Sequence, residues 1–414
     1  MLKEKMLVPQ LRFPEFEGEW KINKLGQIAK FLKGKGISKR DIINDGDNEC
    51  IRYGELYTTY NEVIDSIASK TNVALDVSVL SNENDVIIPS SGETQLDIVT
   101  ASCVLKKGVI LGGDLNIIRT NLNGVFLSYL LNNRKKKDIA KLSQGNSVVH
   151  LYNKQLATLN LNLPTPKEQQ KIANFLTSID NRIQTLEKKK TLLEQYKKGV
   201  MQKIFKQELR FKDDTSTSLS KSDGKAFPEW GEKKLVNILT EFNEKSVISN
   251  QHPILSSTTK GLFKQSDYFT RDIASKDNTG YKILRKQQLV FSPQNLWLGN
   301  INVNCDFEVG IVSPSYKVFD FNKNLTSFIY CKYLLFTNRM FYEYAQASEQ
   351  GASVVRRNLD MSSFKAIPIK LPSKEEQTKI ANFLSSIDKN IALVAKKIEH
   401  TKTYKKGLLQ QMFV

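Results

Sequence analysis

The chain has 414 residues, which is enough for two or three domains, and 40% of them are hydrophobic, as in soluble globular proteins. Its 61 basic residues outnumber the 43 acidic ones, and the net charge of +18 makes a polyanion, with nucleic acid first, the expected partner. No apolar run reaches about 18 residues, and the start lacks the apolar core of a signal peptide, so we expect a cytoplasmic protein without a membrane span or anchor.

The cysteines do not follow a metal-binding or disulfide pattern. Cys50, Cys103, Cys305 and Cys331 are scattered without paired spacing, and the chain has only three histidines to add to them. Zinc sites use short, regular ligand spacings that this sequence lacks. We therefore expect reduced cysteines packed in the interior, with no disulfide and no metal.

Residues 1–162 have the pattern of a sheet-rich domain. Short β-like runs, VIIPSS and GVILGGDLNIIR, are bounded by Gly, Pro, Ser and Asn, and one helix-like stretch, FLSYLLNNRKKKDIAKL, follows them. This order predicts a mixed α/β domain.

Residues 163–206 predict a long, basic helix. Glu168 and Gln169 stand in its first turn, where a carboxylate suits the positive end of the helix dipole. Lys167 to Lys206 contains 10 basic and 4 acidic residues, so this segment is among the most basic parts of the chain. Apolar residues recur at alternating steps of four and three, which is a heptad pattern. The seam consists of Ile172, Leu176, Ile179, Ile183 and Leu186.

A polar segment and a second domain come next. Residues 207–226 include KDDTSTSLSKSDGKA, whose composition is typical of a linker. Residues 227–370 open with FPEW, much as the first domain opens with FPEF and Trp20. They contain the β-like runs LVFSPQ and GIVSPSYKVF and the helix-like stretch SFIYCKYLLFTNRMFYEYA. We predict a second mixed domain of the same kind.

Residues 371–414 repeat the first long helix. Leu163–Phe205 returns as Leu371–Phe413, shifted by 208 positions without a gap, and 22 of these 43 residues are identical. A match of this length indicates duplication of a whole unit. The second seam consists of Ile380, Leu384, Ile387, Ile391 and Val394.

A seam this narrow needs a partner helix, and the other copy is the obvious candidate. The expected fold class is α/β (α+β): two sheet-rich mixed domains separated by two long antiparallel helices that form a coiled-coil-like spacer, with pseudo-two-fold symmetry. At ~1.5 Å per residue, roughly 35 to 40 helical residues span roughly 50 to 60 Å. The alternative, in which each helix packs only against its own domain, stays open.

Catalytic motifs are scarce. The sequence contains no GxxxxGK[ST], GxGxxG, HExxH or GxSxG motif and no Asp/Asn-Pro-Pro-aromatic signature. The two helices match closely, whereas the two domains match only at short anchors. We interpret this as helices that do the same job twice and domains that do different versions of one job. The chain is predicted to be a recognition subunit and not an enzyme.

The motif LPxxxEQxxIAxFL, followed by a basic helix with YKKGxxQ, occurs twice, and FPEF or FPEW opens each globular half. This arrangement closely resembles the specificity (S) subunit of type I restriction-modification enzymes, over essentially the whole chain. The resemblance implies that each globular half is a target recognition domain that reads one half of a split, asymmetric sequence in double-stranded DNA. It also implies that the helices set the spacing and dock two methyltransferase (modification) subunits, to which restriction subunits attach. The chain itself would hold no active site and no cofactor, because S-adenosylmethionine, ATP and Mg²⁺ would be used by the partner subunits.

Residues that read DNA are sought in exposed loops, as Arg, Lys, Asn, Gln or Ser with aromatic support. In the first domain the candidates are Lys33, Lys35, Lys39, Arg40, Arg52, Tyr53, Ser90, Ser91, Gln95 and His150. In the second domain they are Ser256, Ser257, Lys260, Gln294, Asn295, Trp297, Asn300, Ser315, Tyr316, Arg356 and Arg357. For each of them the alternative is an ordinary solvated loop residue, and Trp297 could equally belong to the core. Lysines of the long helices either contact the DNA backbone or face solvent or a partner subunit, and we favour the second for most of them.

Two other functions stay open at this point. One is a purely structural coiled-coil adaptor that joins proteins, for which the basic loops would be incidental. The other is a stand-alone nuclease, against which the missing catalytic motifs argue.

Overall fold

The computed structural model describes residues 7–145, 148–213, 225–270, 273–350 and 357–414. The chain divides into two compact units. Unit 1 comprises Met1–Lys188 and Ala395–Val414, and unit 2 comprises Lys189–Val394. Each unit therefore contains one globular part, the start of one long helix and the end of the other.

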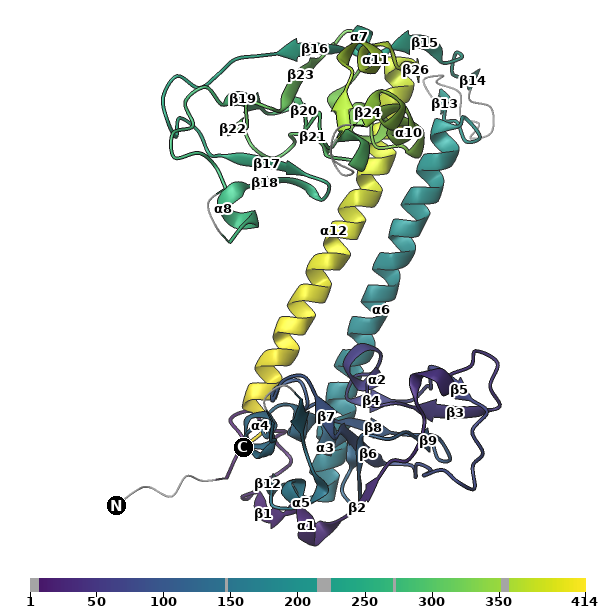
Figure 1. Ribbon diagram of the computed structural model, residues 1–414, viewed down its shortest axis with the longest axis vertical. Helices are drawn as coiled ribbons and strands as arrows, with labels where there is room; N and C mark the ends of the chain where they lie inside the picture. The colour runs from purple at the N-terminus through teal and green to yellow at the C-terminus, as the bar shows by residue number, and fades with distance from the viewer. Residues whose placement is uncertain (1–6, 146–147, 214–224, 271–272, 351–356) are drawn as a thin grey trace. The chain divides into compact units, whose positions relative to one another are not determined.

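Unit 1 is built around a five-stranded sheet with the order β2-β10-β6-β8-β4 (Figure 1). Smaller sheets pair β5-β3-β9, β1-β12 and β11-β7. Its strands are β1 (Lys21–Lys24), β2 (Ala29–Lys33), β3 (Asn48–Ile51), β4 (Val63–Ile64), β5 (Ser69–Thr71), β6 (Asp85–Pro89), β7 (Ser91–Gly92), β8 (Ser102–Val104), β9 (Ile110–Leu111), β10 (Leu115–Thr120), β11 (Val149–His150) and β12 (Asn160–Leu163). Its short helices are α1 (Leu25–Ile28), the 3-10 helix η1 (Lys39–Asp41), α2 (Glu55–Thr58), α3 (Gly124–Asn132), α4 (Lys136–Leu142) and α5 (Asn153–Leu156).

Unit 2 repeats the central sheet with four strands in the order β16-β23-β20-β21. Its strands are β13 (Lys212–Asp213), β14 (Lys225–Ala226), β15 (Gly231–Lys234), β16 (Leu239–Phe242), β17 (Leu255–Thr258), β18 (Gly261–Lys264), β19 (Lys282–Arg285), β20 (Leu289–Phe291), β21 (Ile301–Val303), β22 (Val309–Val312), β23 (Lys317–Phe321), β24 (Ser348–Gln350), β25 (Arg357–Leu359) and β26 (Pro368–Leu371). Its short helices are α7 (Leu235–Ile238), α8 (Gln265–Tyr268), the 3-10 helix η2 (Leu296–Leu298), α9 (Phe328–Leu334), α10 (Asn338–Gln346) and α11 (Met361–Ala366).

The central strands are buried on both faces. In β6, Val86 and Ile88 join one core cluster while Ile87 joins another, as the two-residue repeat of a strand requires. Strand β20 does the same, because Leu289 and Phe291 join one cluster and Val290 the other. The predicted mixed, sheet-rich architecture is therefore present twice, on corresponding strands.

Each predicted helix-like stretch after the sheet is in fact two helices, so the expectation of one continuous helix was wrong. In unit 1, Asn133 ends α3, where its side chain donates to the Tyr129 carbonyl at 2.8 Å. In unit 2, Thr337 separates α9 from α10 and caps the second helix by accepting from the Met340 N–H. Local bonds from these polar side chains compete with helix continuation.

The two long helices are α6 (Pro166–Phe205) and α12 (Lys374–Gln411). In unit 1 the seam residues Ile172, Leu176, Ile179 and Ile183 share one core with the domain and with the end of α12. Unit 2 repeats this, with Ile380, Leu384 and Ile387 beside Val200 and Ile204 of α6. In each unit the start of one helix thus packs beside the end of the other, so the helices run in opposite directions there. The seam packs on a helix and on a domain at once, while Leu186 and Ile391 are half-buried.

Aromatic rings anchor the end of each long helix. In unit 1, Phe413 lies against Trp20 and Phe126, at ring-centroid distances of 6.4 Å and 5.6 Å. In unit 2, Phe205 lies against Trp230 and Tyr330, at 6.4 Å and 5.9 Å. Both tryptophans are buried.

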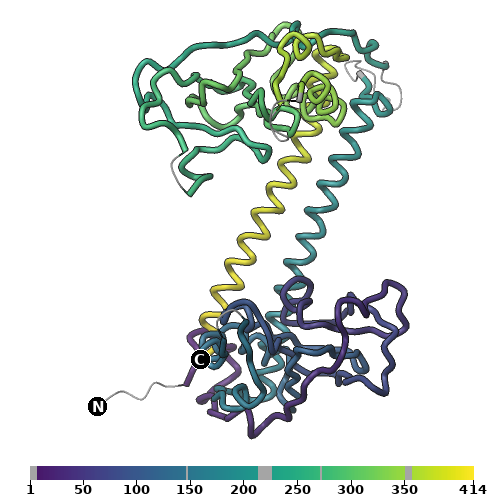
Figure 2. Tube along the Cα trace, in the orientation of Figure 1, coloured from purple at the N-terminus to yellow at the C-terminus, as the bar shows by residue number. Residues whose placement is uncertain are grey.

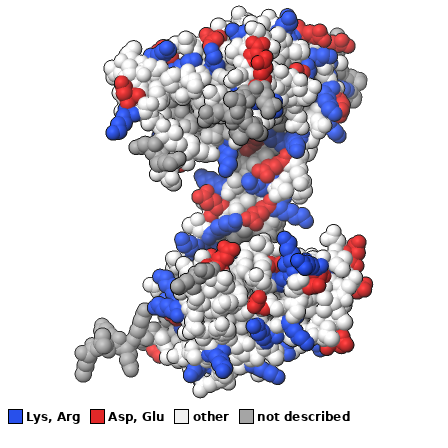
Figure 3. Space-filling model, viewed as in Figure 1, with Lys and Arg blue, Asp and Glu red and all other residues white. Residues whose placement is uncertain are grey.

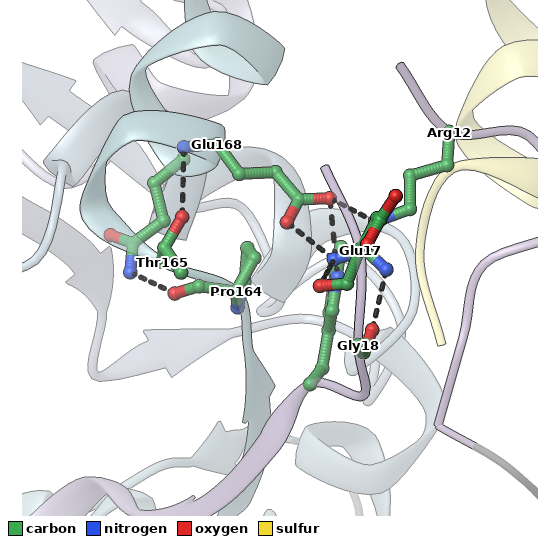
Figure 4. A network of polar contacts seen from close by, with 8 residues as sticks. Arg12, Glu17, Gly18, Pro164, Thr165 and Glu168 are labelled. Atoms are coloured by element: carbon green, nitrogen blue, oxygen red, sulfur yellow. Dashed lines mark hydrogen bonds and ion pairs between the residues drawn. The ribbon is translucent and has the colours of Figure 1, made fainter. Parts of the chain in front are cut away.

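A buried carboxylate fixes the start of each long helix. Glu168 accepts hydrogen bonds from Arg12 Nε and Nη2, both at 2.8 Å, and from Trp20 Nε1 at 3.3 Å (Figure 4). These bonds raise the pKa of Arg12 above its ordinary value. Glu376 holds Arg210 and Trp230 in the same way, at 2.8 Å to 3.1 Å. The network therefore recurs at corresponding positions in both units.

Residues from both ends of the sequence meet in unit 1 (Figure 2). The Leu11 N–H donates to the Gln411 carbonyl at 3.1 Å, and Asn162 Nδ2 donates to the Val414 carbonyl at 3.0 Å. Among the described residues, no helix combines the length and apolar character needed to cross a membrane.

Candidate nucleic-acid interface

Loops at one edge of the unit 1 sheet are locked together by glycines. A Cβ atom at Gly34 would collide with the carbonyl oxygen of Gly112, so only glycine allows the two loops to approach this closely. The Lys35 N–H donates to the Leu111 carbonyl at 3.0 Å, and the Gly113 N–H donates to Gly36 at 2.6 Å. This contact places the exposed Lys35 beside the turn that leads into β10.

A polar cluster lies at the same turn. Ser90 and Ser91 both point their hydroxyls at Asp114 Oδ1, at 3.4 Å, and the Ser91 hydroxyl also lies 3.3 Å from His150 Nδ1. The pairing of β7 with β11 sets His150 opposite Ser91. Ser90 is buried, whereas Ser91 and His150 are half-buried. The structure thus brings together three predicted residues from distant parts of the sequence.

Tyrosines extend this cluster. Tyr57 donates its hydroxyl to the Ser91 carbonyl at 2.9 Å. The predicted Tyr53 lies edge-on to Tyr57, with ring centroids 6.5 Å apart, and both rings are exposed. Tyr152, also exposed, stacks on His150 at 6.1 Å. Exposed aromatic faces beside polar groups suit contact with nucleic-acid bases.

Other predicted residues of unit 1 lie apart from this cluster. Lys39 and Arg40 are exposed in η1, which bonds to β5 through the Thr71 hydroxyl and the Asp41 carbonyl at 2.7 Å. Lys33 ends β2, and Gln95 is exposed in a turn held by Thr94. Arg52 is half-buried, 3.9 Å from Glu55.

Unit 2 gathers its predicted loops around Ser257. The Ser257 hydroxyl donates to Asn300 Oδ1 at 2.7 Å and accepts from Asn302 Nδ2 at 2.8 Å. Tyr316 donates to the Ser257 carbonyl at 3.3 Å, and burial raises the pKa of this phenol. Ser257 and Asn300 are buried, so their polar atoms hold loops together in this structure. Direct contact of these two residues with DNA stays a prediction.

The exposed part of the unit 2 cluster is formed by three other residues. Arg357 begins β25, and its backbone N–H donates to the Gln294 carbonyl at 3.2 Å. The Arg357 guanidinium lies over the Trp297 ring, 4.2 Å from its centroid. Gln294 is exposed, and Arg357 and Trp297 are half-buried. Trp297 is therefore partly accessible and not a core residue.

The remaining predictions for unit 2 fall into three groups. Lys260 and Ser315 are exposed in turns. Ser256 is buried and accepts from Gln265 at 3.2 Å, and the Asn295 carbonyl accepts from the Asn300 N–H at 3.2 Å, so both are tied into the loop framework. Arg356 lies outside the described residues.

Several lysines of the long helices are exposed to solvent. Lys188, Lys189, Lys198, Lys396, Lys397 and Lys406 are exposed, and Figure 3 shows basic side chains along the long helices. Lys197 and Lys405 differ, because each forms an ion pair with an aspartate of the other long helix. Over the described ranges, no group of three or more His, Cys, Asp or Glu side chains is placed to hold a metal ion.

Sequence reasoning missed Tyr57, Asp114, Tyr152 and Asn302. The sequence gives little sign that Asp114 and Asn302 belong to a site. Asp114 lies in the run GGDLN as an ordinary turn residue, and Asn302 lies in a strand. Tyr57 and Tyr152 are each within four residues of a predicted residue in the sequence, namely Tyr53 and His150. A search for aromatics near the polar candidates would have found both.

Comparison with known proteins identifies similar chains. The family model described as "Type I restriction modification DNA specificity domain" matches residues 17–195 and 299–402, which is more than half of the sequence. The MjaVIII specificity subunit of a type I restriction enzyme from Methanocaldococcus jannaschii is 29% identical over 197 residues, 47% of this chain and 43% of that protein. A putative MjaX specificity subunit from the same organism is 28% identical over 321 residues, 72% of this chain and 70% of that protein. The matched region thus spans less than half of the first relative.

Solved structures share the fold over nearly the whole chain. The crystal structure of a type I restriction-modification S subunit from M. genitalium has a TM-score of 0.59 at 14% identity, covering 98% of this chain and 99% of that chain. A structure reported for complex assembly and conformational transition of a type I system has a TM-score of 0.52 at 16% identity, covering 95% and 96%. The predicted fold class, two mixed domains with two long helices, is confirmed by these neighbours.

Proposed function

The chain belongs to the family of type I restriction modification DNA specificity domains, and from that premise we propose that it selects the DNA target of a multi-subunit methyltransferase and endonuclease complex. Family membership confirms the expected class, a recognition subunit and not an enzyme. It favours neither the coiled-coil adaptor nor the stand-alone nuclease.

The two units share a fold, but their loop clusters contain different residues. This observation supports a more detailed proposal for target recognition. Unit 1 presents His150 with Ser91 and exposed tyrosines, whereas unit 2 presents Arg357 on Trp297. Base identity is read by the donors and acceptors of such side chains, so different sets select different sequences. We therefore propose that each unit reads one half of a split, asymmetric target in double-stranded DNA.

The long helices are proposed to set the distance between the two half-sites. Each is a single helix of 40 or 38 residues that starts in one unit and ends in the other. A continuous helix rises ~1.5 Å per residue, so its length is a direct measure of separation.

We also propose that the helices dock two methyltransferase subunits, and corresponding grooves in the two units support this. The unit 1 groove, about 310 Å³, is lined by residues that include Gln184, Lys402, Lys406 and Leu409. The unit 2 groove, about 390 Å³, has Glu194, Lys198 and Met201 on one wall, at the matched helix positions 208 residues earlier, and Phe336–Arg339 on the other. The two grooves share one wall, the last part of a long helix, and this repeated wall suits two copies of one partner.

The remaining assignments follow from this role. Restriction subunits would join through the modification subunits, and the complex would work in the cytoplasm. S-adenosylmethionine, ATP and Mg²⁺ would serve the partner subunits, with no cofactor held by this chain.

The test is methylation mapping. The chain is co-expressed with its cognate methyltransferase subunit in a methylation-free host, and methyladenine is mapped across the genome. A split, asymmetric motif is expected, and a continuous palindrome would refute the proposal.

A second experiment tests the spacing role. Deleting the matched heptads Lys188–Glu194 and Lys396–Lys402 keeps the seam in register and shortens each helix by roughly 10 Å, or about three base pairs. The spacer should shorten by that amount while both half-sites stay the same. Deleting seven residues within 214–224 is the control and should leave the spacer unchanged. An unchanged spacer after the helix deletions would refute the spacing role.

A further inference from the structure

Arg357 and Trp297 form a cation–π pair at the loop cluster of unit 2. The guanidinium carbon of Arg357 lies 4.2 Å from the centroid of the Trp297 ring. Contact with an aromatic face restricts the orientations that the planar fork of arginine N–H donors can adopt. Both residues are half-buried, so part of each is accessible from outside.

Arg357 differs from the other described arginines of unit 2 in its charge partners. Arg210 pairs with Glu376 at 2.8 Å, Arg285 with Glu244 at 2.8 Å and Arg339 with Glu343 at 3.9 Å. Within the described part of unit 2, no carboxylate lies within 4 Å of Arg357. Its donors are therefore not committed to an internal ion pair.

The loop that carries Trp297 holds the ring in place under Arg357. Leu296, directly before Trp297, is fully buried. Gly299 adopts φ of 90°, a conformation that favours glycine, and its N–H donates to the Leu296 carbonyl at 2.8 Å. The Arg357 backbone is tied to the same loop through Gln294. Ring and guanidinium are thus positioned before any ligand arrives.

We propose that Arg357, held on Trp297, reads a guanine in the half-site recognised by unit 2. Guanine presents two acceptors, O6 and N7, side by side in the major groove, and the arginine fork matches them with two parallel donors. No other base presents two acceptors on that edge. This inference rests on the proposed function and adds the base that one named residue selects.

Methylation mapping of variants tests the inference first. With Arg357→Gln, one guanine of one half-site should become degenerate or change to adenine, because glutamine pairs with the adenine edge. The other half-site and the spacer should stay the same. The matched control is Arg285→Gln, since Arg285 also lies over a ring, that of Phe242, but is paired with Glu244 and should leave the motif unchanged. A motif that stays the same in Arg357→Gln overturns the inference.

A binding measurement covers the case in which a variant does not fold. The wild-type complex is bound to duplexes in which each guanine of the motif is replaced in turn by adenine or by 7-deazaguanine, which lacks the N7 acceptor. One guanine should lose roughly 5- to 150-fold in affinity on replacement by adenine. The same position should be sensitive to 7-deazaguanine, and Arg357→Met, whose side chain has no N–H donor, should remove that sensitivity.

The outcomes separate the two proposals. If the wild-type complex methylates no split motif, the proposed function fails. If the motif is split but none of its guanines responds to 7-deazaguanine or to the identity of residue 357, only the present inference fails.

Discussion

Lys405 Nζ lies 2.8 Å from Asp180, and the equivalent pair in unit 2, Lys197 and Asp388, is separated by 2.6 Å. Each lysine also lies over a tyrosine ring, Tyr129 in unit 1 and Tyr333 in unit 2. Lys405 has an additional carboxylate, Glu62, at 3.3 Å. Each pair ties the start of one long helix to the end of the other within a unit.

Replacing these lysines should destabilise unit 1 more than unit 2. Lys405→Met leaves Asp180 and Glu62 facing each other without a cation, at about 16% exposure, and should lower the free energy of unfolding by about 1 to 3 kcal/mol. Lys197→Met removes a more exposed pair and should cost about 1 kcal/mol. Urea denaturation measures both, with the exposed Lys396→Met as control. Equal losses in all three variants would contradict this order.

Replacing the buried carboxylates at the helix starts should lower the free energy of unfolding more than replacing these lysines. Glu168→Gln weakens the acceptor of three hydrogen bonds and leaves the Arg12 charge without its partner, so the free energy of unfolding should fall by about 2 to 4 kcal/mol. Glu376→Gln should give a similar loss in unit 2. Glu399→Gln, at an exposed position of α12, should change stability by less than about 0.5 kcal/mol and is the control in the same denaturation series.

Loss of an aromatic anchor should open a cavity in unit 1. Phe413→Ala removes a ring that is 5% exposed and packed on Trp20 and Phe126, and should cost about 3 kcal/mol or more. The change in tryptophan fluorescence on thermal unfolding reports the midpoint, which should fall. Tyr404→Ala, at a position 57% exposed on the same helix, should leave it nearly unchanged. A Phe413→Ala midpoint equal to that of the control would show that the ring does not anchor the helix.

One pH effect follows from a pair on the unit 2 sheet. The hydrogen bond from Lys317 to Glu241, at 2.6 Å, lowers the pKa of Glu241 below its ordinary value of 4.5. A carboxyl group whose pKa is lower in the folded protein than in the unfolded chain stabilises the fold fully at pH values above its ordinary pKa. This stabilisation is lost as the pH falls through the lowered pKa of the folded state. Glu241→Gln should therefore cost under about 1 kcal/mol at pH 7, and its difference from the wild type should shrink in acid. Denaturation at pH 7 and at about pH 3 measures the difference, and a constant difference would contradict the assignment.

The framework was predictable from the sequence because it rests on periodicity and repetition. The heptad steps identified the helices, and four of the five residues in each predicted seam are buried. The partner of Glu168 was not predictable, because Arg12 stands 156 positions away and only the fold brings them together. The repeat showed that residue 168 has an equivalent at 376 but not that both are buried acceptors.

The loop clusters were predicted only in part. Choosing polar residues in expected loops identified Ser91, His150 and Arg357, which lie in clusters in the structure. It also selected Ser257 and Asn300, whose polar groups bond to each other in the interior. Burial of a loop serine depends on how several loops close over one another, and local composition does not encode that closure.

The division of unit 1 between two distant parts of the sequence fixes an order of events during synthesis. All of unit 2 leaves the ribosome before Ala395–Val414, so its core can close first. Unit 1, whose globular part is made earliest, lacks Leu408, Met412 and Phe413 until the final turns of α12 appear. The domain translated first therefore completes its core last, when Phe413 reaches Trp20.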